Sequence, residues 1–466
     1  MRIFLPSRPI LGGLLFAGIA LVPIPGAPGV AAPRPIGWHS VPTILARIQA
    51  PTFPARDFPI TSYGARHDGD FDCTDAINKA IEACHAAGGG RVVVAGGTFV
   101  TGAVHLKDNV NLHVAEGATL KFSPEPARFL PVVRTRFEGI ECMNYSPLIY
   151  AFERENIAVT GKGTLDGSAS NDTWWGLVRP RPGSNVDVRA SYNRLREFGE
   201  KGVPVEQRVF GAGHTLRPSF ILPFRCRNVL IEDVQIINSP MWEIHPVLST
   251  NVTVRGVTVV SHGPNNDGCN PDSSRDVLIE NCVFDTGDDC IAIKSGKDAD
   301  GRRVGVSSEN IVVRNCVMKD GHGGVVLGSE VSGGVRNVFV EDCRMDSPNL
   351  DRALRLKTNS DRGGFIENIF LRNVAVGRVA HSVLTIDLVY GRVTAGPYPP
   401  VVRNVLMENV TGASSPRVLS VVGTPDSTIE HVRLVDCVFR GIEAADVLEH
   451  AGSLSYHNVT IEPANH

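Results

Sequence analysis

A short phrase that recurs along the second half of the chain constrains its fold more than any other sequence feature. The phrase begins with Asn or Asp, continues with alternating β-branched residues and a charged residue, and ends with Asn or Asp followed by Cys or Val. Clear copies occupy residues 228–234, 276–282 and 310–316. Counted from Asn228 and including a weaker copy at Asn251, the spacings are 23, 25, 34, 27, 31, 36 and 27 residues. This range indicates a constant core with loops of variable length.

The composition of each copy favours short strands joined by turns. Runs of Val and Ile alternation are separated by Gly, Asn, Asp or Ser, and the whole chain, with 47 Gly and 31 Pro, is unlike a long-helix protein. A unit of about 25 residues cannot bury its apolar face alone and must stack on its neighbours. The regular Leu spacing of leucine-rich repeats is absent, and propeller blades need longer, more constant units. We therefore expect an all-β, single-domain, right-handed parallel β-helix over residues 57–466.

The N-terminus has the order of a secretory signal peptide. Arg2 and Arg8 precede an apolar stretch over residues 10–24, and a run of small residues follows at 29–33. We expect a signal peptide at residues 1–31, an extension at residues 32–56 and export to the periplasm or the extracellular space. An uncleaved anchor is the alternative, although the stretch is short for a membrane span.

Two other features outside the repeat concern the ends and edges of the solenoid. Residues 74–87 form an amphipathic pattern that Gly88 terminates, and Thr74 is a candidate N-cap. We expect this helix to cap the first coils, because a solenoid exposes unpaired strands at its ends. The off-register stretches 122–145 and 179–208 are expected to be surface excursions that shape a cleft, the second one partly helical.

Cysteine positions and net charge set further limits. Cys282, Cys316, Cys343 and Cys437 each follow Asn or Asp at the same place in the phrase, as expected for one small buried residue per coil. We expect mostly free, buried thiols and leave a bridge between Cys73 and Cys84 open. With 46 basic and 49 acidic residues, the net charge of −3 gives no sign of a nucleic-acid or anionic-membrane partner. A monomer is expected.

Four polar segments fall at similar phases of successive copies: residues 265–268, 287–290, 321–324 and 354–357. Equivalent positions on neighbouring coils of a β-helix lie about 4.8 Å apart. The segments are therefore expected to form one patch that contains Asp267, Asp288, Asp289, His322, Arg355 and Lys357.

Such a patch suits the hydrolysis of a glycosidic bond. Three crowded carboxyls cannot all ionise freely, so the pKa of at least one is expected to rise. Hydrolysis needs one protonated carboxyl to donate to the leaving oxygen and one ionised carboxylate to activate water. Two neighbouring cations favour an anionic substrate, because a guanidinium can hold a carboxylate through two hydrogen bonds.

In this order the four motifs resemble those of glycoside hydrolase family 28, the polygalacturonases and related pectin hydrolases, whose pattern is Asn-Thr-Asp, Gly-Asp-Asp, Gly-His-Gly and Arg-Ile-Lys. Residues 63–77 resemble the start of pectin-active β-helices, and residues 141–147 resemble bacterial members, several of which are exo-acting. The resemblance implies hydrolysis of α-1,4-galacturonosidic bonds in polygalacturonan or oligogalacturonides, with inversion. Exo action is expected, although the loops at the cleft ends decide between exo and endo.

The resemblance also implies roles for individual residues. Asp288 is the expected general acid, which His322 would orient or tune. Asp267 and Asp289 would position the attacking water. Substrate binding is expected from Arg355, Lys357, Asn266, Lys294 and His245. Asn266 stands where the family has Thr, and for His245 a structural role is equally open.

Three other functions remain as alternatives. A β-helix pectate lyase would be expected to use calcium and a basic residue instead of this acid cluster. A related pectin hydrolase would act on xylogalacturonan or rhamnogalacturonan. A non-enzymatic solenoid would only bind polysaccharide. No zinc-type ligand spacing and no nucleotide-binding loop occur, so neither a metal nor another cofactor is expected.

Overall fold

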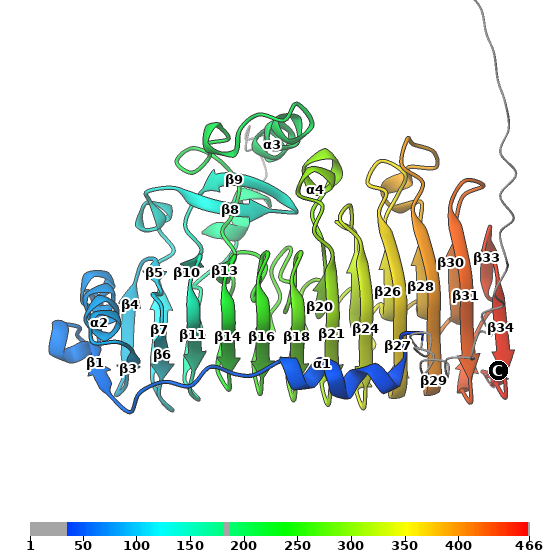
Figure 1. Ribbon diagram of the computed structural model, residues 1–466, viewed down its shortest axis with the longest axis horizontal. Helices are drawn as coiled ribbons and strands as arrows, with labels where there is room; N and C mark the ends of the chain where they lie inside the picture. The colour runs from blue at the N-terminus through cyan, green and yellow to red at the C-terminus, as the bar shows by residue number, and fades with distance from the viewer. Residues whose placement is uncertain (1–34, 180–186, 465–466) are drawn as a thin grey trace, which may run out of the picture. The chain divides into compact units, whose positions relative to one another are not determined.

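The computed structural model describes residues 35–179 and 187–464, and the unit that begins at Ile36 is a parallel β-helix. The predicted signal peptide, residues 1–31, lies outside the described residues. Successive coils stack from the blue end to the red end of Figure 1, and each coil contributes strands to three rows, here called A, B and C. The helix is right-handed, as parallel crossover connections nearly always are. The predicted fold is confirmed.

The strands of the three rows have the following bounds. Row A contains β1 (Asp57–Pro59), β3 (Gly90–Val94), β6 (Val110–Val114), β11 (Glu155–Thr160), β14 (Arg227–Glu232), β16 (Thr250–Arg255), β18 (Arg275–Glu280), β21 (Ser308–Arg314), β24 (Val335–Glu341), β27 (Phe365–Arg378), β29 (Val401–Ser414), β31 (Thr428–Val435) and β34 (Leu454–His457). Row B contains β2 (Asp68–Asp72), β4 (Thr98–Thr101), β7 (Thr119–Phe122), β12 (Thr164–Asp166), β15 (Gln235–Ile237), β17 (Thr258–Ser261), β19 (Val283–Thr286), β22 (Val317–Met318), β25 (Arg344–Met345), β32 (Val438–Ile442) and β35 (Thr460–Pro463). The long strands β27 and β29 pair in both rows.

Row C carries the site described below. It contains β5 (Val104–His105), β10 (Ile149–Phe152), β13 (Ile221–Phe224), β20 (Ile291–Ile293), β23 (Val325–Gly328), β26 (Arg352–Lys357), β28 (Ser382–Asp387), β30 (Arg417–Val422) and β33 (Val447–Glu449). Single bridges from Ile221 through Ile244 and Cys269 to Ile291 continue the row between β13 and β20.

The residue that opens each phrase explains why the phrase recurs. It stands at the start of a row A strand with a positive φ, for example 58° at Asn228 and 57° at Asn310, which Asn tolerates better than other non-Gly residues. Its amide also hydrogen-bonds to the equivalent side chain on the preceding coil, at 2.7 Å from Asn251 to Asn228 and 3.0 Å from Asn368 to Asn337. The repeated Asn thus satisfies both a backbone conformation and a side-chain ladder.

The closing residue of the phrase fills one interior position in each coil. Cys282, Cys316, Cys343 and Cys437 all lie there and are buried. All ten cysteines are buried and free, including Cys73 and Cys84, so the bridge left open between those two does not form. The stacked Val, Ile, Leu and Cys side chains make one continuous core inside the coils.

Helices cover one end and one outer face of the solenoid. Helix α2 (Thr74–Ala86) packs Ile77, Ile81 and Cys84 against the first coils, as expected of a cap. Thr74 is the first helical residue, and Cys73 occupies the N-cap position predicted for Thr74. Asp72 Oδ1 accepts hydrogen bonds from the Thr74 backbone N–H at 3.0 Å and from its hydroxyl at 2.5 Å.

Helix α1 (Val41–Arg47) belongs to the predicted N-terminal extension. It lies against outward-facing residues of row A, including Leu278 and Val312 (Figure 1). None of the helices in the described ranges is long and apolar enough to cross a membrane.

The two off-register stretches form structures beside the first half of row C. The antiparallel hairpin of β8 (Val133–Phe137) and β9 (Ile140–Asn144) comes from the first, and α3 (Ala190–Glu200) from the second. They lie near α4 (Asp298–Val304), which follows β20 (Figure 1). Short 3-10 turns complete the described elements: η1 (Trp38–Ser40), η2 (Ile60–Tyr63), η3 (Pro126–Phe129), η4 (Trp174–Leu177), η5 (Val205–Gln207) and η6 (Tyr390–Arg392). Of the excursion predicted at 179–208, the described residues 187–208 include the expected helix, α3.

Candidate active site

The register of row C brings the predicted polar segments together. Cys269 pairs with Ile291, Ile291 with Val325, and Val325 with Leu354. Asp267 and Asp289 each stand two residues before a member of this series, so they are neighbours on adjacent coils. Backbone hydrogen bonds fix the contact, with the Gly268 N–H donating to the Asp289 carbonyl at 3.0 Å.

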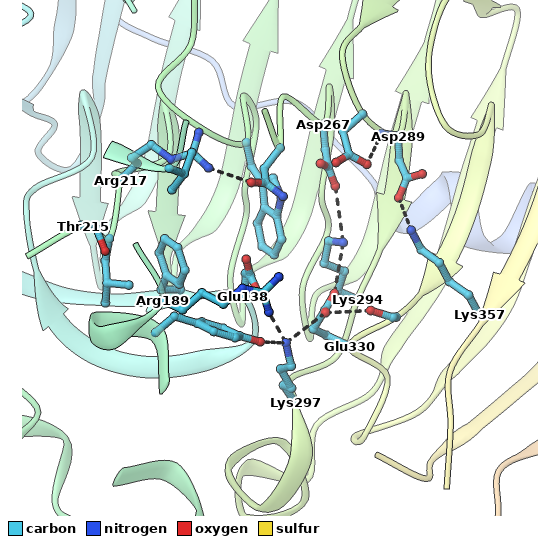
Figure 2. Close-up of a pocket in the computed structure, with 18 of the residues that line it drawn as sticks. Glu138, Arg189, Thr215, Arg217, Asp267, Asp289, Lys294, Lys297, Glu330 and Lys357 are labelled. Carbon is cyan, nitrogen blue, oxygen red and sulfur yellow. Dashed lines mark hydrogen bonds and ion pairs between the residues drawn. The ribbon is translucent and has the colours of Figure 1, made fainter. Parts of the chain in front are cut away.

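A cavity of about 500 Å³ lies over this part of row C. Among the described residues, its lining includes five acids and six bases: Glu138, Asp267, Asp288, Asp289, Glu330, Arg189, Arg217, Lys294, Lys297, Lys357 and Arg362. Figure 2 shows Asp267 and Asp289 between Arg217 on one side and Lys357 on the other. The cavity therefore combines crowded carboxyls with a surplus of positive charge.

Each of the three predicted carboxyls has a different set of partners. Lys357 donates to Asp289 Oδ2 at 2.8 Å, and Asp289 Oδ1 is buried without a hydrogen-bond partner among the described residues. Asp267 Oδ2 accepts a hydrogen bond from Asn270 at 2.7 Å and lies 3.4 Å from the Lys294 ammonium. Asp288 Oδ1 lies 3.0 Å from His322 Nδ1. Asp289 therefore keeps an open acceptor, and Asp288 is paired with an imidazole.

These surroundings shift the pKa values in opposite directions. Burial, reinforced by the charge of Asp288, raises the pKa of Asp267 well above its ordinary value. Burial also acts to raise the pKa of Asp288, but the hydrogen bond from His322 and the charge of Lys357 outweigh it and lower that pKa to about 2. The same hydrogen bond raises the pKa of His322. In the free protein the readily held protons therefore reside on Asp267 and His322.

Comparison with known proteins gives the family. Residues 211–443 match the family described as glycosyl hydrolases family 28. The chain is 47% identical to a hyperthermoactive exopolygalacturonase from Thermotoga maritima, with a TM-score of 0.88 over 91% of this chain and 96% of that one. The chain belongs to glycosyl hydrolase family 28.

Two further relatives align over less than two thirds of their own length. An exo-poly-α-D-galacturonosidase from Dickeya chrysanthemi is 30% identical over 81% of this chain and 66% of that protein. A probable polygalacturonase from Vitis vinifera is 28% identical over 69% of this chain and 61% of that protein.

Two residues that we expected to bind substrate are instead buried next to the site and have structural contacts. Asn266 is fully buried, and its amide oxygen accepts from Ser261 and Gly263 while its nitrogen donates to the backbone carbonyls of Ser239 and Met241. The expectation that Asn266 binds substrate is therefore corrected, because the folded turn uses all four hydrogen bonds of the amide.

His245 is the second such residue. Its side chain is fully buried, with Nδ1 3.1 Å from Ser219 Oγ and Nε2 3.4 Å from Asp272 Oδ2. It is not among the residues that line the cavity. The structure thus favours the structural role that the sequence left open, and not a place on the cleft surface.

The remaining predicted residues lie in or beside the cavity. Lys294 lines it and forms ion pairs with Asp267 at 3.4 Å and Glu330 at 3.3 Å. Arg355 is half-buried beside the cavity, with its guanidinium 5.7 Å from the ring centre of the cavity-lining Tyr390. Arg355 forms no ion pair with any described residue, so its charge is open to a ligand.

Sequence reasoning missed several charged residues of the cavity. Glu330 is buried and lies within 3.8 Å of Lys294, Lys297 and Arg362. Burial acts to raise the pKa of Glu330, but these cations outweigh it and hold the pKa well below its ordinary value. Glu330 follows β23 closely. A comparison of its coil with the coil that contains Lys294 could have identified Glu330 from the sequence.

One end of the cavity, here called the closed end, is built by the off-register stretches. Phe137 and Glu138 come from the tip of the β8–β9 hairpin, and Val188, Arg189 and Tyr192 come from the start of α3 and the residues before it. Lys297 ties the two together, because it pairs with Glu138 at 3.3 Å and hydrogen-bonds to the Tyr192 hydroxyl. These contacts have no counterpart in the repeat.

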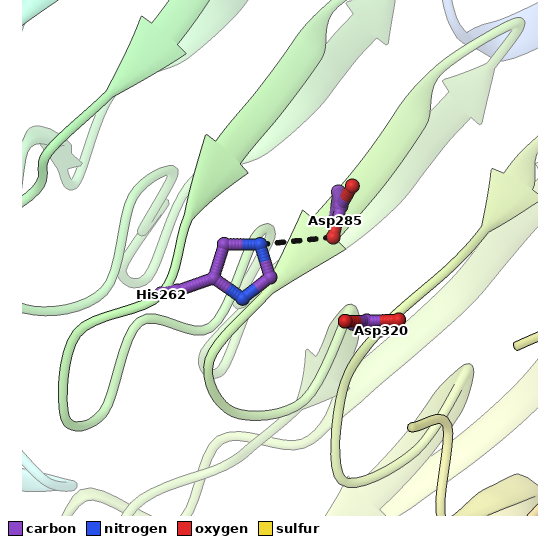
Figure 3. Close-up of side chains that lie close together, drawn as sticks. All are labelled: His262, Asp285 and Asp320. Atoms are coloured by element: carbon purple, nitrogen blue, oxygen red, sulfur yellow. Dashed lines mark ion pairs between the residues drawn. The ribbon is translucent and has the colours of Figure 1, made fainter. Parts of the chain in front are cut away.

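Two groups among the described residues have the close spacing that a metal ion requires. Asp288, Asp289 and His322 form one, and His262, Asp285 and Asp320 form the other. Figure 3 shows the second group, in which His262 Nε2 lies 2.9 Å from Asp285 Oδ1. In each group the histidine pairs directly with one carboxylate, His322 with Asp288 and His262 with Asp285. None of the residues in the second group lines the cavity.

Proposed function

We propose that this protein hydrolyses α-1,4-galacturonosidic bonds of polygalacturonan and oligogalacturonides, with inversion, from a chain end. The observation that carries the proposal is the single cavity in which three carboxyls meet a surplus of cations. Neighbouring carboxyls that differ in pKa suit glycosidic hydrolysis, which needs one acid and one base, and the cations suit a sugar that carries a carboxylate. The names of the Thermotoga maritima and Dickeya chrysanthemi relatives, which describe exo-acting galacturonan enzymes, support it.

Asp288 is proposed as the general acid, with His322 as the source of its proton. In the free protein the pKa of Asp288 is lowered to about 2, so the transferable proton resides on His322, 3.0 Å away. An anionic sugar that enters the cavity and displaces water raises the pKa of a neighbouring carboxyl. Binding of substrate thus favours transfer of the proton from His322 to Asp288, which can then protonate the leaving oxygen.

Asp289 is proposed to take a proton from the attacking water. Its Oδ2 is occupied by Lys357, while its buried Oδ1 is free to accept a hydrogen bond. Asp267, whose pKa is raised by burial, would hold the same water in place from the adjacent coil. One water shared between two acids on neighbouring coils accounts for inversion at a separation shorter than usual for inverting pairs.

Action at a chain end is proposed from the closed end of the cavity. The hairpin tip at Glu138 and the α3 segment at Tyr192 line the cavity and are joined through Lys297. We infer that they block the path of a longer polysaccharide. We also propose that residues 1–31 direct export, that residues 57–466 are the catalytic domain and that the protein is a monomer with a pectic substrate. The acid cluster does not favour a lyase.

The test compares the two bond-breaking chemistries on polygalacturonate. Hydrolysis releases reducing ends without an unsaturated product that absorbs in the ultraviolet, and it persists in the presence of a chelator. Asp288→Asn should remove it, whereas Asp285→Asn, on the outer side of the same coil, should not. Ultraviolet absorbance that grows with product would contradict the proposal.

A second measurement tests the acid role by itself. An aryl galacturonide with a leaving group that needs no proton should restore turnover to Asp288→Asn but not to Asp289→Asn. Equal loss in both variants on this substrate would contradict the assignment of Asp288.

A further inference from the structure

One buried cation of the cavity, Arg217, has no charged partner among the described residues. Arg217 is buried, with 1% of its surface exposed, and it forms no ion pair with any described residue. Burial lowers its pKa to about 10, so it still carries its charge at neutral pH. In contrast, Lys294, Lys297, Lys357 and Arg362 each have a carboxylate nearby. An unpaired buried charge is costly, and an anion in the cavity would remove that cost.

Neutral acceptors hold the Arg217 guanidinium in a fixed orientation. Its Nη1 donates to the carbonyl oxygens of Pro240 and Pro264, both at 2.7 Å, and its Nη2 donates to Asn265 Oδ1 at 2.7 Å. Pro264 and Asn265 immediately precede the turn that presents Asp267. The guanidinium is therefore positioned by the same segment that positions one of the acids.

The donors that remain match a carboxylate. A guanidinium has five N–H groups, and three are used by Pro240, Pro264 and Asn265. Nε–H has no partner, and one N–H of Nη2 is left. Two neighbouring N–H groups are the arrangement that binds both oxygens of a carboxylate.

We propose that Arg217 is a specificity-determining residue that binds the carboxylate of the galacturonate unit at the closed end of the cavity. The inference rests on the proposed function, because that function supplies a carboxylate on every sugar. Arg217 and Lys357 lie on opposite sides of Asp267 and Asp289 (Figure 2). Two successive sugars across the cleaved bond would thus each meet a separate cation.

The first test uses two digalacturonates, each methyl-esterified at one of its two units, alongside the free acid. Wild-type protein should bind one of these esters about tenfold to a hundredfold more weakly than the acid, as expected for loss of a hydrogen bond between charged groups. Arg217→Lys keeps the charge but loses the paired donors, so it should lose discrimination against that ester only. Calorimetry in an Asp288→Asn background measures binding without turnover.

Asn265→Asp provides a second test, which leaves Arg217 itself unchanged and so does not depend on whether an Arg217 variant folds. It places a carboxylate against Nη2, and the positive φ of 56° at this residue is one that Asp accepts. The variant should unfold at a higher temperature and bind galacturonate at least tenfold more weakly, because the charge of Arg217 is already matched. Arg225→Lys changes an exposed arginine that follows β13 on the same coil; it serves as the control and should change neither property.

The outcomes separate this inference from the proposed function. If Arg217→Lys weakens binding of the acid and of both esters equally, Arg217 has only a structural role. The same conclusion follows if Asn265→Asp gains stability while its affinity for galacturonate is unchanged. If wild-type protein does not hydrolyse polygalacturonate, the proposed function fails, while the ester comparison by calorimetry still judges Arg217.

Discussion

The β8–β9 hairpin is anchored to row C by a buried ion pair whose removal should be measurable. Arg136 of β8 is fully buried, and its Nη1 lies 2.8 Å from Asp272 Oδ1 and 3.0 Å from Ser273 Oγ. The backbone of Asp272 forms a β-bridge with that of Lys294 in row C, and the Asp272 side chain is also fully buried. Arg136→Met keeps much of the side-chain volume but leaves Asp272 with His245, the Ser273 hydroxyl and the Gly296 N–H as its partners and with no permanent cation beside it.

The expected loss follows from the burial of both partners. Removing one partner of a buried pair costs about 3–5 kcal/mol, because the other charge stays buried without compensation. Burial acts to raise the pKa of Asp272, but Arg136 and His245 outweigh it and lower the pKa below its ordinary value of 3.8. A lowered folded-state pKa gives stability that is present above this value and lost as the pH falls through the folded pKa. The difference between wild type and Arg136→Met should therefore shrink in acid.

Chemical denaturation of four proteins tests this reasoning: wild type, Arg136→Met, Asp272→Asn and the double variant. The coupling free energy should exceed about 1 kcal/mol, since residues in direct contact are not additive. Arg227→Met is the control, because its ion pair with Glu155 is largely exposed and should contribute less than about 1 kcal/mol. Additive effects, or a cost for Arg136→Met no larger than for the control, would refute the anchoring role.

Three further predictions concern the site. Asp288→Asn should lower kcat on polygalacturonate by about 10² to 10⁴ while galacturonate still binds; unchanged kcat would exclude Asp288 as the acid. Glu243 is fully buried, and burial together with the charge of Asp267 raises its pKa well above 4.5. The difference in unfolding free energy between Glu243→Gln and wild type should therefore rise by about 1.36 kcal/mol per pH unit above pH 4.5, up to the folded pKa, because only wild type has to keep a proton on this residue. A difference that does not depend on pH would be evidence against a neutral Glu243. His322→Gln should lose most stability between about pH 4 and 6.5, because the raised pKa of His322 and the lowered pKa of Asp288 keep both groups charged there. Chemical denaturation at several pH values measures this loss, and an equal loss at every pH would contradict the pairing.

Much of the fold could be predicted because the β-helix imposes the same demand on every coil. The Asn that opens the phrase is needed for a positive φ and for the amide ladder, as at Asn228 and Asn368, and so it recurs in the sequence. The proximity of Asp267 and Asp289 could be predicted for the same reason, since they stand at equivalent positions on adjacent coils.

The rest of the site could not be predicted because the repeat does not govern it. Glu138 reaches the cavity on a hairpin that does not follow the repeat of the coils. Arg217 precedes the first clear copy of the phrase. Asn266 sits in a motif that resembles the family pattern, yet its direction depends on which backbone groups the turn leaves unsatisfied. The raised pKa of Asp267 depends on its burial, and the lowered pKa of Asp288 depends on its contact with His322. Spacing along the sequence gives neither.

The most direct test of the central claim is a time course of polygalacturonate digestion in which every product is sized. If the acids act in a cavity closed by the hairpin and α3, galacturonate should be the product from the first time point, and the remaining polymer should shorten slowly. An early mixture of oligomers would contradict cleavage at a chain end, and no release of reducing sugar at all would contradict the hydrolytic role of the cavity.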